Sequence, residues 1–380
     1  MEYRKLEKLG ISTSLLGFGT MRLPVSNQNN SEIIEEEAIN MIRYAIDAGV
    51  NYIDTAYMYH DGNSELVVGK ALKEGYREKV FIADKMPVWM AKSEEEMHQI
   101  FETQFARLGV DCIDFYLVHN ITKPIWKIAN KYHLLEFLEK KRAQGKIKYI
   151  GFSFHDSKEF FKEIINAYPW DFCQIQFNYM DTEYQAGLEG LQYATSKEIP
   201  VMVMEPLKGS RLAIQPPKQV QDVWDRFNVK RKPAEWALRW LGNFPSVHVI
   251  LSGMTTMEQV KENIETLSHI KPNTLSKEEL DLIKEVKETY ANLIKINCSE
   301  CSYCMPCPSK VNIPKIFAYY NDMFLYDLND LTLKDFNTFV PPKQRASICV
   351  ECGQCQDHCP QQLPIIQLLK KTVDVLEGKG

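Results

Sequence analysis

Short apolar runs alternate with longer amphipathic segments between residues 15 and 267 of this 380-residue chain. Eight runs rich in Val, Ile, Phe and Tyr lie at 15–19, 51–54, 80–85, 113–119, 147–153, 172–176, 200–205 and 247–252. Helical patterns follow them in turn, at 36–48, 65–73, 94–108, 134–144, 158–167, 186–196, 233–241 and 257–267. Strands buried on both faces read as continuous apolar runs, so this alternation is typical of a parallel (β/α)8 barrel.

The main alternative is an open, doubly wound parallel sheet. That fold binds dinucleotides through a Gly-x-Gly-x-x-Gly turn after its first strand, and no such turn follows residue 19. The segments 3–6 and 11–14, on either side of a turn at Gly10, predict a hairpin that plugs the bottom of the barrel. We therefore expect an α/β chain whose first domain is a (β/α)8 TIM barrel.

Eight of the ten cysteines form two tight runs near the C-terminus. The runs are Cys298-x2-Cys301-x2-Cys304-x2-Cys307-Pro308 and Cys349-x2-Cys352-x2-Cys355-x3-Cys359-Pro360. Cysteines three residues apart converge on one small object, and a closing Cys-Pro is typical of [4Fe–4S] loops. In two-cluster ferredoxins the last cysteine of each run serves the other cluster. We therefore assign one cluster to Cys298, Cys301, Cys304 and Cys359, and the other to Cys307, Cys349, Cys352 and Cys355.

Zinc and disulfides are the other chemistries that cysteine runs serve. Zinc sites use paired Cys-x2-Cys motifs rather than four cysteines in one run. A disulfide framework needs an oxidising compartment, and the charged segment 1–10 lacks the apolar stretch of a signal peptide. The sequence thus favours two [4Fe–4S] clusters in a cytoplasmic protein, with Cys112 and Cys173 as buried small hydrophobic residues.

The strand–helix alternation stops after residue 267. A helical pattern at 275–290 leads to the first cysteine run, and two more lie between the runs, at 313–320 and 331–339. The sequence predicts two domains: a barrel with its connecting helix at 1–290, and a small, mainly α-helical ferredoxin-like domain at 291–380.

The composition limits the partners of the chain. It is 45% hydrophobic and 25% charged, as in ordinary globular proteins. A net charge of −5 favours neither nucleic acid nor an anionic membrane. No apolar stretch has the roughly 20 residues that a membrane-spanning helix needs. We expect no nucleic-acid or membrane partner.

Polar side chains close three consecutive predicted strands, where the active sites of such barrels lie. Asp54 ends the second strand, Lys85 the third and His119 the fourth. Tyr59 follows Asp54 by five residues. A charged group that closes an apolar strand is costly unless paired, so we expect Asp54 and Lys85 to pair. We also expect Lys85 to lower the pKa of Tyr59, making it a proton donor or acceptor near neutral pH.

Taken alone, each of these residues is also compatible with a purely structural role. A strand-end histidine is more often a core residue, and an Asp–Lys pair is often only a structural ion pair. Four such residues at the same end of three consecutive strands favour catalysis. In that reading His119 donates a hydrogen bond to a substrate oxygen.

Eight stretches of the predicted barrel carry a family signature. They are GFGTMRLP at 17–24, AGVNYIDTAYMYHDGNSE at 48–65, ADKMP at 83–87, DFYLVHN at 114–120, IGFS at 150–153, QIQFN at 174–178, EPLKGS at 205–210 and SGMTTMEQVKEN at 252–263. In order and in strand position they resemble the aldo-keto reductase family. The resemblance covers residues 1 to 267 and implies a catalytic tetrad of Asp54, Tyr59, Lys85 and His119.

The resemblance also implies NADPH or NADH as hydride donor, bound across the barrel mouth. Matched to the family's motifs, the cofactor-binding residues are Thr20, Asp54, Ser153, Gln174, Met204, Pro206, Leu207, Gly253, Thr255, Gln259, Glu262 and Asn263. The family often has Asn after the serine and an aromatic residue on the nicotinamide, where this chain has Phe154 and Met204. At Gln259 it lacks an arginine to grip a 2′-phosphate, so we expect discrimination between NADPH and NADH within about tenfold.

The whole chain resembles the subgroup of aldo-keto reductases with a C-terminal ferredoxin-like extension. This implies an oxidoreductase that reduces a small-molecule carbonyl, with Tyr59 as the proton donor. A hydride carries two electrons and a [4Fe–4S] cluster passes one, so the role of the clusters stays open. They exchange electrons with an external ferredoxin or other carrier, or they are structural or sensing elements, or the barrel is only a scaffold for an electron carrier. The segment 120–133, with Pro124, Trp126 and Tyr132, is predicted to be a loop that borders the substrate.

Overall fold

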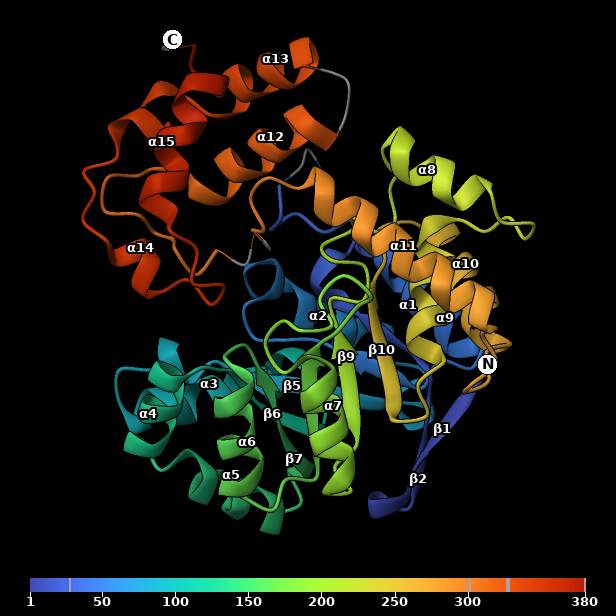
Figure 1. Cartoon of the computed structure of the whole chain (residues 1–380). Helices are drawn as coiled ribbons and strands as arrows, with labels where there is room; N and C mark the ends of the chain where they lie inside the picture. The colour runs from blue at the N-terminus through green and yellow to red at the C-terminus, as the bar shows by residue number, and fades with distance from the viewer. Residues whose placement is uncertain (27–28, 299, 301, 326–328, 379–380) are drawn as a thin grey trace. The chain divides into compact units, whose positions relative to one another are not determined.

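The computed structural model describes residues 1–26, 29–298, 300, 302–325 and 329–378. Its strands β3 to β10 form a closed parallel barrel in the order β10-β3-β4-β5-β6-β7-β8-β9 (Figure 1). Their bounds are Leu16–Gly19 (β3), Tyr52–Asp54 (β4), Phe81–Met86 (β5), Ile113–Ile121 (β6), Ile147–Phe154 (β7), Phe172–Gln176 (β8), Val201–Met204 (β9) and Val247–Gly253 (β10). The predicted TIM barrel is confirmed, and the open sheet is excluded because β10 pairs with β3.

Helices alternate with these strands. Their bounds are Glu35–Asp47 (α1), Asn63–Ala71 (α2), Glu94–Leu108 (α3), Lys123–Lys131 (α4), Leu134–Ala143 (α5), Lys158–Ala167 (α6), Gly187–Ser196 (α7), Lys218–Asp225 (α8), Pro233–Gly242 (α9) and Met257–Ser268 (α10). Several begin where a side-chain oxygen caps the first turn: Ser93, Ser157 and Thr256 accept backbone N–H groups of α3, α6 and α10. The eight predicted helices are present, and α4 and α8 are additional.

The N-terminal hairpin consists of β1 (Tyr3–Leu6) and β2 (Ile11–Ser14), with Gly10 in the left-handed region at φ 67°. Its Leu6 is fully buried and packs against barrel-interior side chains such as Tyr52 and Phe115. The interior is thus a filled apolar core rather than a channel. The predicted hairpin is confirmed at its predicted bounds.

The chain divides into two compact units. The first consists of residues 1–207 and 234–275, and the second of residues 208–233 and 276–380. The second unit contains α8, α11 (Lys277–Leu293), α12 (Ile313–Leu325), α13 (Asn329–Phe339), α14 (Gln354–Asp357) and α15 (Ile365–Leu376). It is mainly α-helical, as predicted. The predicted domain boundary at residue 290 stays a prediction.

The second unit has a core of its own. Ile316 and Phe317 of α12 and Leu369 of α15 are buried in one apolar cluster with Val311 and Phe336. Cysteine side chains of both runs pack against this cluster. Helix α8 packs against α11, and Arg226 and Glu285 form an ion pair between them.

Among the described helices, none combines the length and apolarity that crossing a membrane requires.

Candidate active site and cluster pockets

Four polar residues meet at the carboxyl ends of β4, β5 and β6. Lys85 is fully buried, and its Nζ donates to Asp54 Oδ1 at 2.6 Å and to the carbonyl of Thr55 at 2.7 Å. The same Nζ lies 3.4 Å from the hydroxyl of Tyr59. The ring of His119 lies edge-on to that of Tyr59, with centroids 6.4 Å apart. The structure therefore brings the predicted tetrad together and confirms the Asp54–Lys85 pair, while the catalytic roles stay predictions.

Burial and neighbouring charges together set the protonation states of Lys85 and Tyr59. Burial alone would lower the pKa of Lys85, but the charges of Asp54 and Tyr59 outweigh it and raise that pKa. Lys85 is therefore an ammonium at neutral pH. Burial, opposed by Lys85, raises the pKa of Tyr59 above its ordinary value. Lys85 does act to lower the pKa of Tyr59, as predicted, but the predicted net lowering is wrong, because desolvation of the tyrosinate exceeds the attraction of the ammonium.

Burial also keeps His119 neutral. Desolvation, followed by the nearby Lys85 charge, holds the pKa of His119 well below its ordinary value. Within the described residues, His119 Nδ1 is buried without a hydrogen-bond partner. A neutral imidazole with an unused ring nitrogen in the mouth suits hydrogen bonding to a substrate oxygen, as predicted for His119.

The loop that carries Tyr59 is anchored on both sides. Tyr59 begins a short 3-10 turn, Tyr59–Gly62, in which His60 has a φ of 52°. The buried His60 ring accepts the backbone N–H of Leu23 through Nε2 at 3.2 Å, and its Nδ1 bonds to the carbonyl of Asn30 at 2.7 Å. This anchoring fixes Tyr59 beside Lys85.

Thr20, a predicted cofactor residue, has its hydroxyl engaged inside the protein. It donates to the carbonyl of Asp54 at 2.9 Å and accepts from the hydroxyl of Ser64 at 2.7 Å. These bonds hold the carboxyl end of β4 in place.

Three more predicted cofactor residues lie on consecutive strands. Ser153 on β7 accepts the backbone N–H of Asn120 at 2.7 Å, and Gln174 on β8 is its register partner. Gln174 Nε2 lies 3.5 Å from the sulfur of Met204 on β9. Gln174 Oε1 is buried and has no hydrogen-bond partner among the described residues. An orphaned acceptor at this position fits a donor such as the amide of a nicotinamide. Pro206 and Leu207 follow the end of β9 directly.

The predicted adenosine segment runs from the end of β10 into α10. Gly253 is exposed at the strand end, and the Thr255 backbone N–H donates to Gln259 Oε1 at 2.8 Å. Asn263 turns inward, and its Nδ2 donates to the hydroxyl of Ser252 at 3.1 Å. Glu262 is its neighbour on α10. The predicted cofactor role of Asn263 stays a prediction.

Arg22 is a cation beside this segment that the sequence analysis missed. Its side-chain stem lies over Gly253, where a Cβ would approach the Arg22 Cβ to 3.2 Å. The hydroxyl of Thr255 donates to the Arg22 carbonyl at 3.0 Å. Lys261, a second cation near this segment, has its Nζ over the ring of Tyr44, 5.6 Å from the ring centroid. Only the three-dimensional meeting of β3 and β10 brings Arg22 here, so no local motif reveals it.

The segment 120–133 differs from its prediction. It continues β6 to Ile121 and then forms helix α4, which Thr122 caps. The ring of Trp126 lies 6.3 Å from that of Trp170. The aromatic residue beside the tetrad is instead Trp89, whose ring lies 5.1 Å from that of His119. Trp89 stands four residues after Lys85, which is the one local signal for it.

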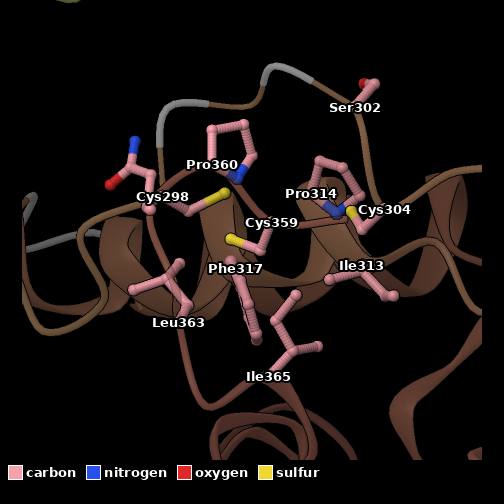
Figure 2. A pocket seen from close by; sticks show the side chains of 11 residues that line it. Cys298, Ser302, Cys304, Ile313, Pro314, Phe317, Cys359, Pro360, Leu363 and Ile365 are labelled. Atoms are coloured by element: carbon pink, nitrogen blue, oxygen red, sulfur yellow. The ribbon is translucent and has the colours of Figure 1, made fainter. Parts of the chain in front are cut away.

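The first cluster pocket lies between α12 and the end of the second cysteine run. Cys298, Cys304 and Cys359 line it, together with Phe317 and Ile365. Figure 2 shows the sulfur atoms of Cys298 and Cys359 turned toward the same space. The fourth predicted ligand of this pocket, Cys301, lies outside the described residues. Cys359 joins the first run here, as the predicted exchange of last cysteines requires.

The second cluster pocket gathers the other predicted set. Its lining includes Cys307, Cys349, Cys352 and Cys355. Burial, and then the thiolates of Cys349 and Cys307, raise the pKa of Cys355, as expected for sulfurs that lie together. Two pockets lined by the two predicted sets of cysteines fit two clusters of one kind.

The two cysteine loops share the pattern Cys-x-Glu-Cys-x2-Cys and repeat each other in backbone geometry. Glu300 and Glu351 both have a φ of 56°, and the backbone N–H of each donates to the sulfur of the cysteine two residues before it at 3.4 Å. Lys310 and Gln362, each three residues after the last cysteine of its run, also adopt positive φ. Such N–H···S bonds stabilise thiolates that hold a cluster.

Zinc draws four ligands to about 2.0–2.3 Å from one point. Across the part of the chain that the structure describes, no three His, Cys, Asp or Glu side chains converge closely enough to hold one ion.

Two family models match the chain. The model described as "Aldo/keto reductase family" matches residues 15–288, and the one described as "4Fe-4S dicluster domain" matches residues 297–363.

Curated relatives match parts of the chain. The chain is 27% identical over 322 residues to "NADH-specific methylglyoxal reductase" of Escherichia coli K12, covering 73% of this chain and 96% of the relative. It is 36% identical over 159 residues to "Probable aldo-keto reductase 1" of Glycine max, covering 39% of this chain and 44% of that protein. It is 30% identical over 200 residues to "Methylglyoxal reductase YeaE" of Escherichia coli K12, covering 50% of this chain and 66% of that protein.

Solved structures agree with the barrel. An aldo-keto reductase from Klebsiella pneumoniae in complex with NADPH superposes with a TM-score of 0.60 at 25% identity, covering 76% of this chain and 96% of that one. The holo form of aldo-keto reductase AKR11C1 from Bacillus halodurans superposes with a TM-score of 0.61 at 24% identity, covering 75% of this chain and 96% of that one.

Proposed function

This chain belongs to the aldo/keto reductase family, and on that premise we propose that it reduces a small-molecule carbonyl through Asp54, Tyr59, Lys85 and His119. Family membership makes it an NAD(P)-dependent oxidoreductase. The second family model adds a 4Fe-4S domain. The observation that carries the proposed chemistry is the buried Lys85 ammonium, 2.6 Å from Asp54 and 3.4 Å from the hydroxyl of Tyr59.

Tyr59 is the proton donor in this proposal. Its raised pKa keeps the phenol protonated at neutral pH, as an acid must be before it protonates a developing alkoxide. The Lys85 ammonium stabilises the tyrosinate that remains after proton transfer, and Asp54 fixes the direction of Lys85. His119, neutral and hydrogen-bonding, orients the carbonyl oxygen toward Tyr59.

Ser153 and Gln174 are the proposed residues for the nicotinamide end of the cofactor. The nicotinamide, when bound, supplies the hydride. The orphaned Gln174 Oε1 would accept its amide, and Met204 would cover the ring with a polarizable sulfur. Arg22 beside Thr255 provides a positive charge for a phosphate, which favours NADPH more than the sequence alone indicated. We propose that NADPH and NADH both bind.

A small carbonyl compound is the proposed substrate. Two of the relatives are named as methylglyoxal reductases, so methylglyoxal is the first compound to test. Trp89 beside His119 forms an apolar wall next to the carbonyl position. It excludes water from the reacting group and leaves Tyr59 as the proton source.

The cysteines of the two pockets are proposed to hold two [4Fe–4S] clusters, which pass single electrons when bound. At the second pocket Cys352 is exposed, and the neighbouring Val350 is 67% exposed. We propose that this exposed edge exchanges electrons with a ferredoxin or another one-electron carrier. Thiolate-held clusters persist in reducing surroundings, which agrees with a cytoplasmic protein.

Replacing the proposed acid tests this function. We expect Tyr59→Phe to lower the rate of methylglyoxal reduction about a hundredfold or more, with cofactor binding retained, because only the donating hydroxyl is removed. Tyr57→Phe is the matched control, since no hydrogen bond of the Tyr57 hydroxyl is present among the described residues. Steady-state rates and cofactor titration by fluorescence measure both effects. Equal rates for the two variants would contradict the role of Tyr59.

A further inference from the structure

Two buried carboxyl groups lie behind Lys85, on the face of β5 that turns away from the barrel interior. Successive side chains of a strand point to opposite faces, so Asp84 points away from the mouth that Lys85 enters. Asp84 and Glu65 of α2 are both fully buried. Neither belongs to the proposed tetrad.

Each of these carboxyl groups has one oxygen with a donor and one without. Asp84 Oδ1 accepts the backbone N–H of Lys85 at 2.8 Å, and Glu65 Oε2 accepts from Arg107 Nη1 at 2.8 Å. The other two oxygens, Asp84 Oδ2 and Glu65 Oε1, are buried and accept no hydrogen bond from an N–H or hydroxyl group of the described residues. Among the acidic groups, Glu65 acts most strongly on Asp84. Two buried carboxylates that each lack a donor for one oxygen repel each other, and one proton shared by the pair relieves both the repulsion and the missing hydrogen bond, so we infer that one of them is protonated.

The surroundings place that proton on Asp84. Arg107 compensates the negative charge of Glu65, whereas Asp84 receives only a backbone N–H. Burial, followed by the charge of Glu65, raises the pKa of Asp84 well above its ordinary value.

Two further titratable groups lie near Asp84 on the strands. Lys85 is its chain neighbour, and Tyr116 on β6 is its register partner. The hydroxyl of Tyr116 donates to Gln104 Oε1, so it is already engaged. Gln104 also donates to the carbonyl of Lys85 at 3.0 Å, which fixes the Lys85 peptide from the helix side.

We propose that Asp84 is a neutral carboxylic acid that shares its proton with Glu65 and acts as a positioning residue for Lys85. The proposal rests on the proposed catalytic role of Lys85. Asp84 holds the Lys85 backbone N–H without adding a negative charge next to the ammonium. The positive charge of Lys85 is thereby left to Asp54 and Tyr59. An ionised Asp84 would compete for it and raise the pKa of Tyr59 further.

Infrared spectroscopy of the purified protein, with its clusters in place, tests the shared proton. We expect a protonated carboxylic-acid carbonyl band at neutral pH that Asp84→Asn removes. Asp111→Asn, at an exposed aspartate, is the matched control and leaves the band unchanged. A spectrum in which Asp84→Asn changes no acid band would overturn the proposal. This readout needs no turnover, so it is independent of whether the protein reduces carbonyls.

The pH profile of carbonyl reduction tests the positioning role. Asn keeps the shape and neutrality of the proposed acid, so we expect Asp84→Asn to leave the alkaline limb of kcat/KM in place. Asp84→Ala loses the contact and should lower kcat about tenfold with cofactor binding unchanged, an effect that Asn rescues. An alkaline limb that moves to lower pH in Asp84→Asn would show that wild-type Asp84 is ionised, and would overturn the proposal. If wild type itself reduces no carbonyl, the proposed function fails while the infrared result still decides the proton pair.

Discussion

At the scale of single residues, burial sets the acid–base behaviour of the barrel mouth. The pKa of Tyr59 is raised and that of His119 is lowered, and desolvation is the largest cause in both. Both shifts favour the uncharged form of the side chain. The mouth therefore presents one fixed cation, Lys85, to a substrate at neutral pH.

The pH dependence of catalysis follows from these directions. Reduction needs a protonated Tyr59, and a raised pKa keeps it protonated until the pH passes its ordinary value of 10.0. We expect kcat/KM for reduction to stay flat between about pH 6 and pH 9 and to fall at higher pH. Alcohol oxidation needs the tyrosinate, so its rate should rise with pH over the same range.

Initial rates in both directions across this range measure the two profiles. His119 should contribute no limb near its ordinary value of 6.5, because its lowered pKa keeps it neutral there. An acid limb of reduction centred near that value would mean that His119 titrates in the mouth and is more exposed than the structure shows.

Single residues also mark the limit of what the sequence reveals. The tetrad could be predicted because each member stands at or just after a strand end, which local patterns locate. The raised pKa of Tyr59 could not be predicted from the sequence, because desolvation depends on atoms from distant segments. Arg22 reaches Gly253 only because β3 pairs with β10, a contact between opposite ends of the barrel sequence.

At the scale of elements, periodicity predicted the barrel strands and eight of its helices closely. Helix α4 was missed because the segment 120–133 mixes aromatic and charged residues, although Thr122 and Pro124 are start signals for a helix. The pairing of the cysteine runs could be predicted from spacing, because Cys359 lines the pocket of the first run. Their matching backbone turns were missed, although both runs read Cys-x-Glu-Cys around the positive-φ residues Glu300 and Glu351.

One contact in the second unit predicts how the first cluster pocket is stabilised. Arg211 Nη1 donates to the carbonyl of Cys298 at 3.4 Å, and Arg211 forms an ion pair with Glu300. We expect Arg211→Gln to loosen this loop, so that about half of the bound iron, the share of one of two clusters, is lost faster in air. Iron assays during air exposure of anaerobically purified protein measure the loss.

Arg226→Gln is the matched control, because Arg226 lies in the same segment but pairs with Glu285 on α11. Its iron should be lost at the wild-type rate. If both variants lose iron equally fast, Arg211 has no specific role at the first pocket.

At the scale of the whole molecule, the chain passes between its two units three times, after residues 207, 233 and 275. The segment 208–233 continues directly from the end of β9, where Met204 lies, yet packs within the unit of the cysteine pockets. Local patterns cannot predict such an assignment, because it depends on contacts between α8 and α11, which lie far apart in the sequence.

In the proposed reaction the hydride passes directly to the carbonyl in the barrel mouth, and Tyr59 gives the proton. Reduction of methylglyoxal with NAD(P)H that carries deuterium at both positions of nicotinamide C4 tests this most directly. In ordinary water we expect one deuterium on the new alcohol carbon, measured by mass spectrometry and NMR. An alcohol carbon whose new hydrogen comes from the water, with no deuterium, would show that electrons reach the substrate by another route, and would contradict direct hydride transfer.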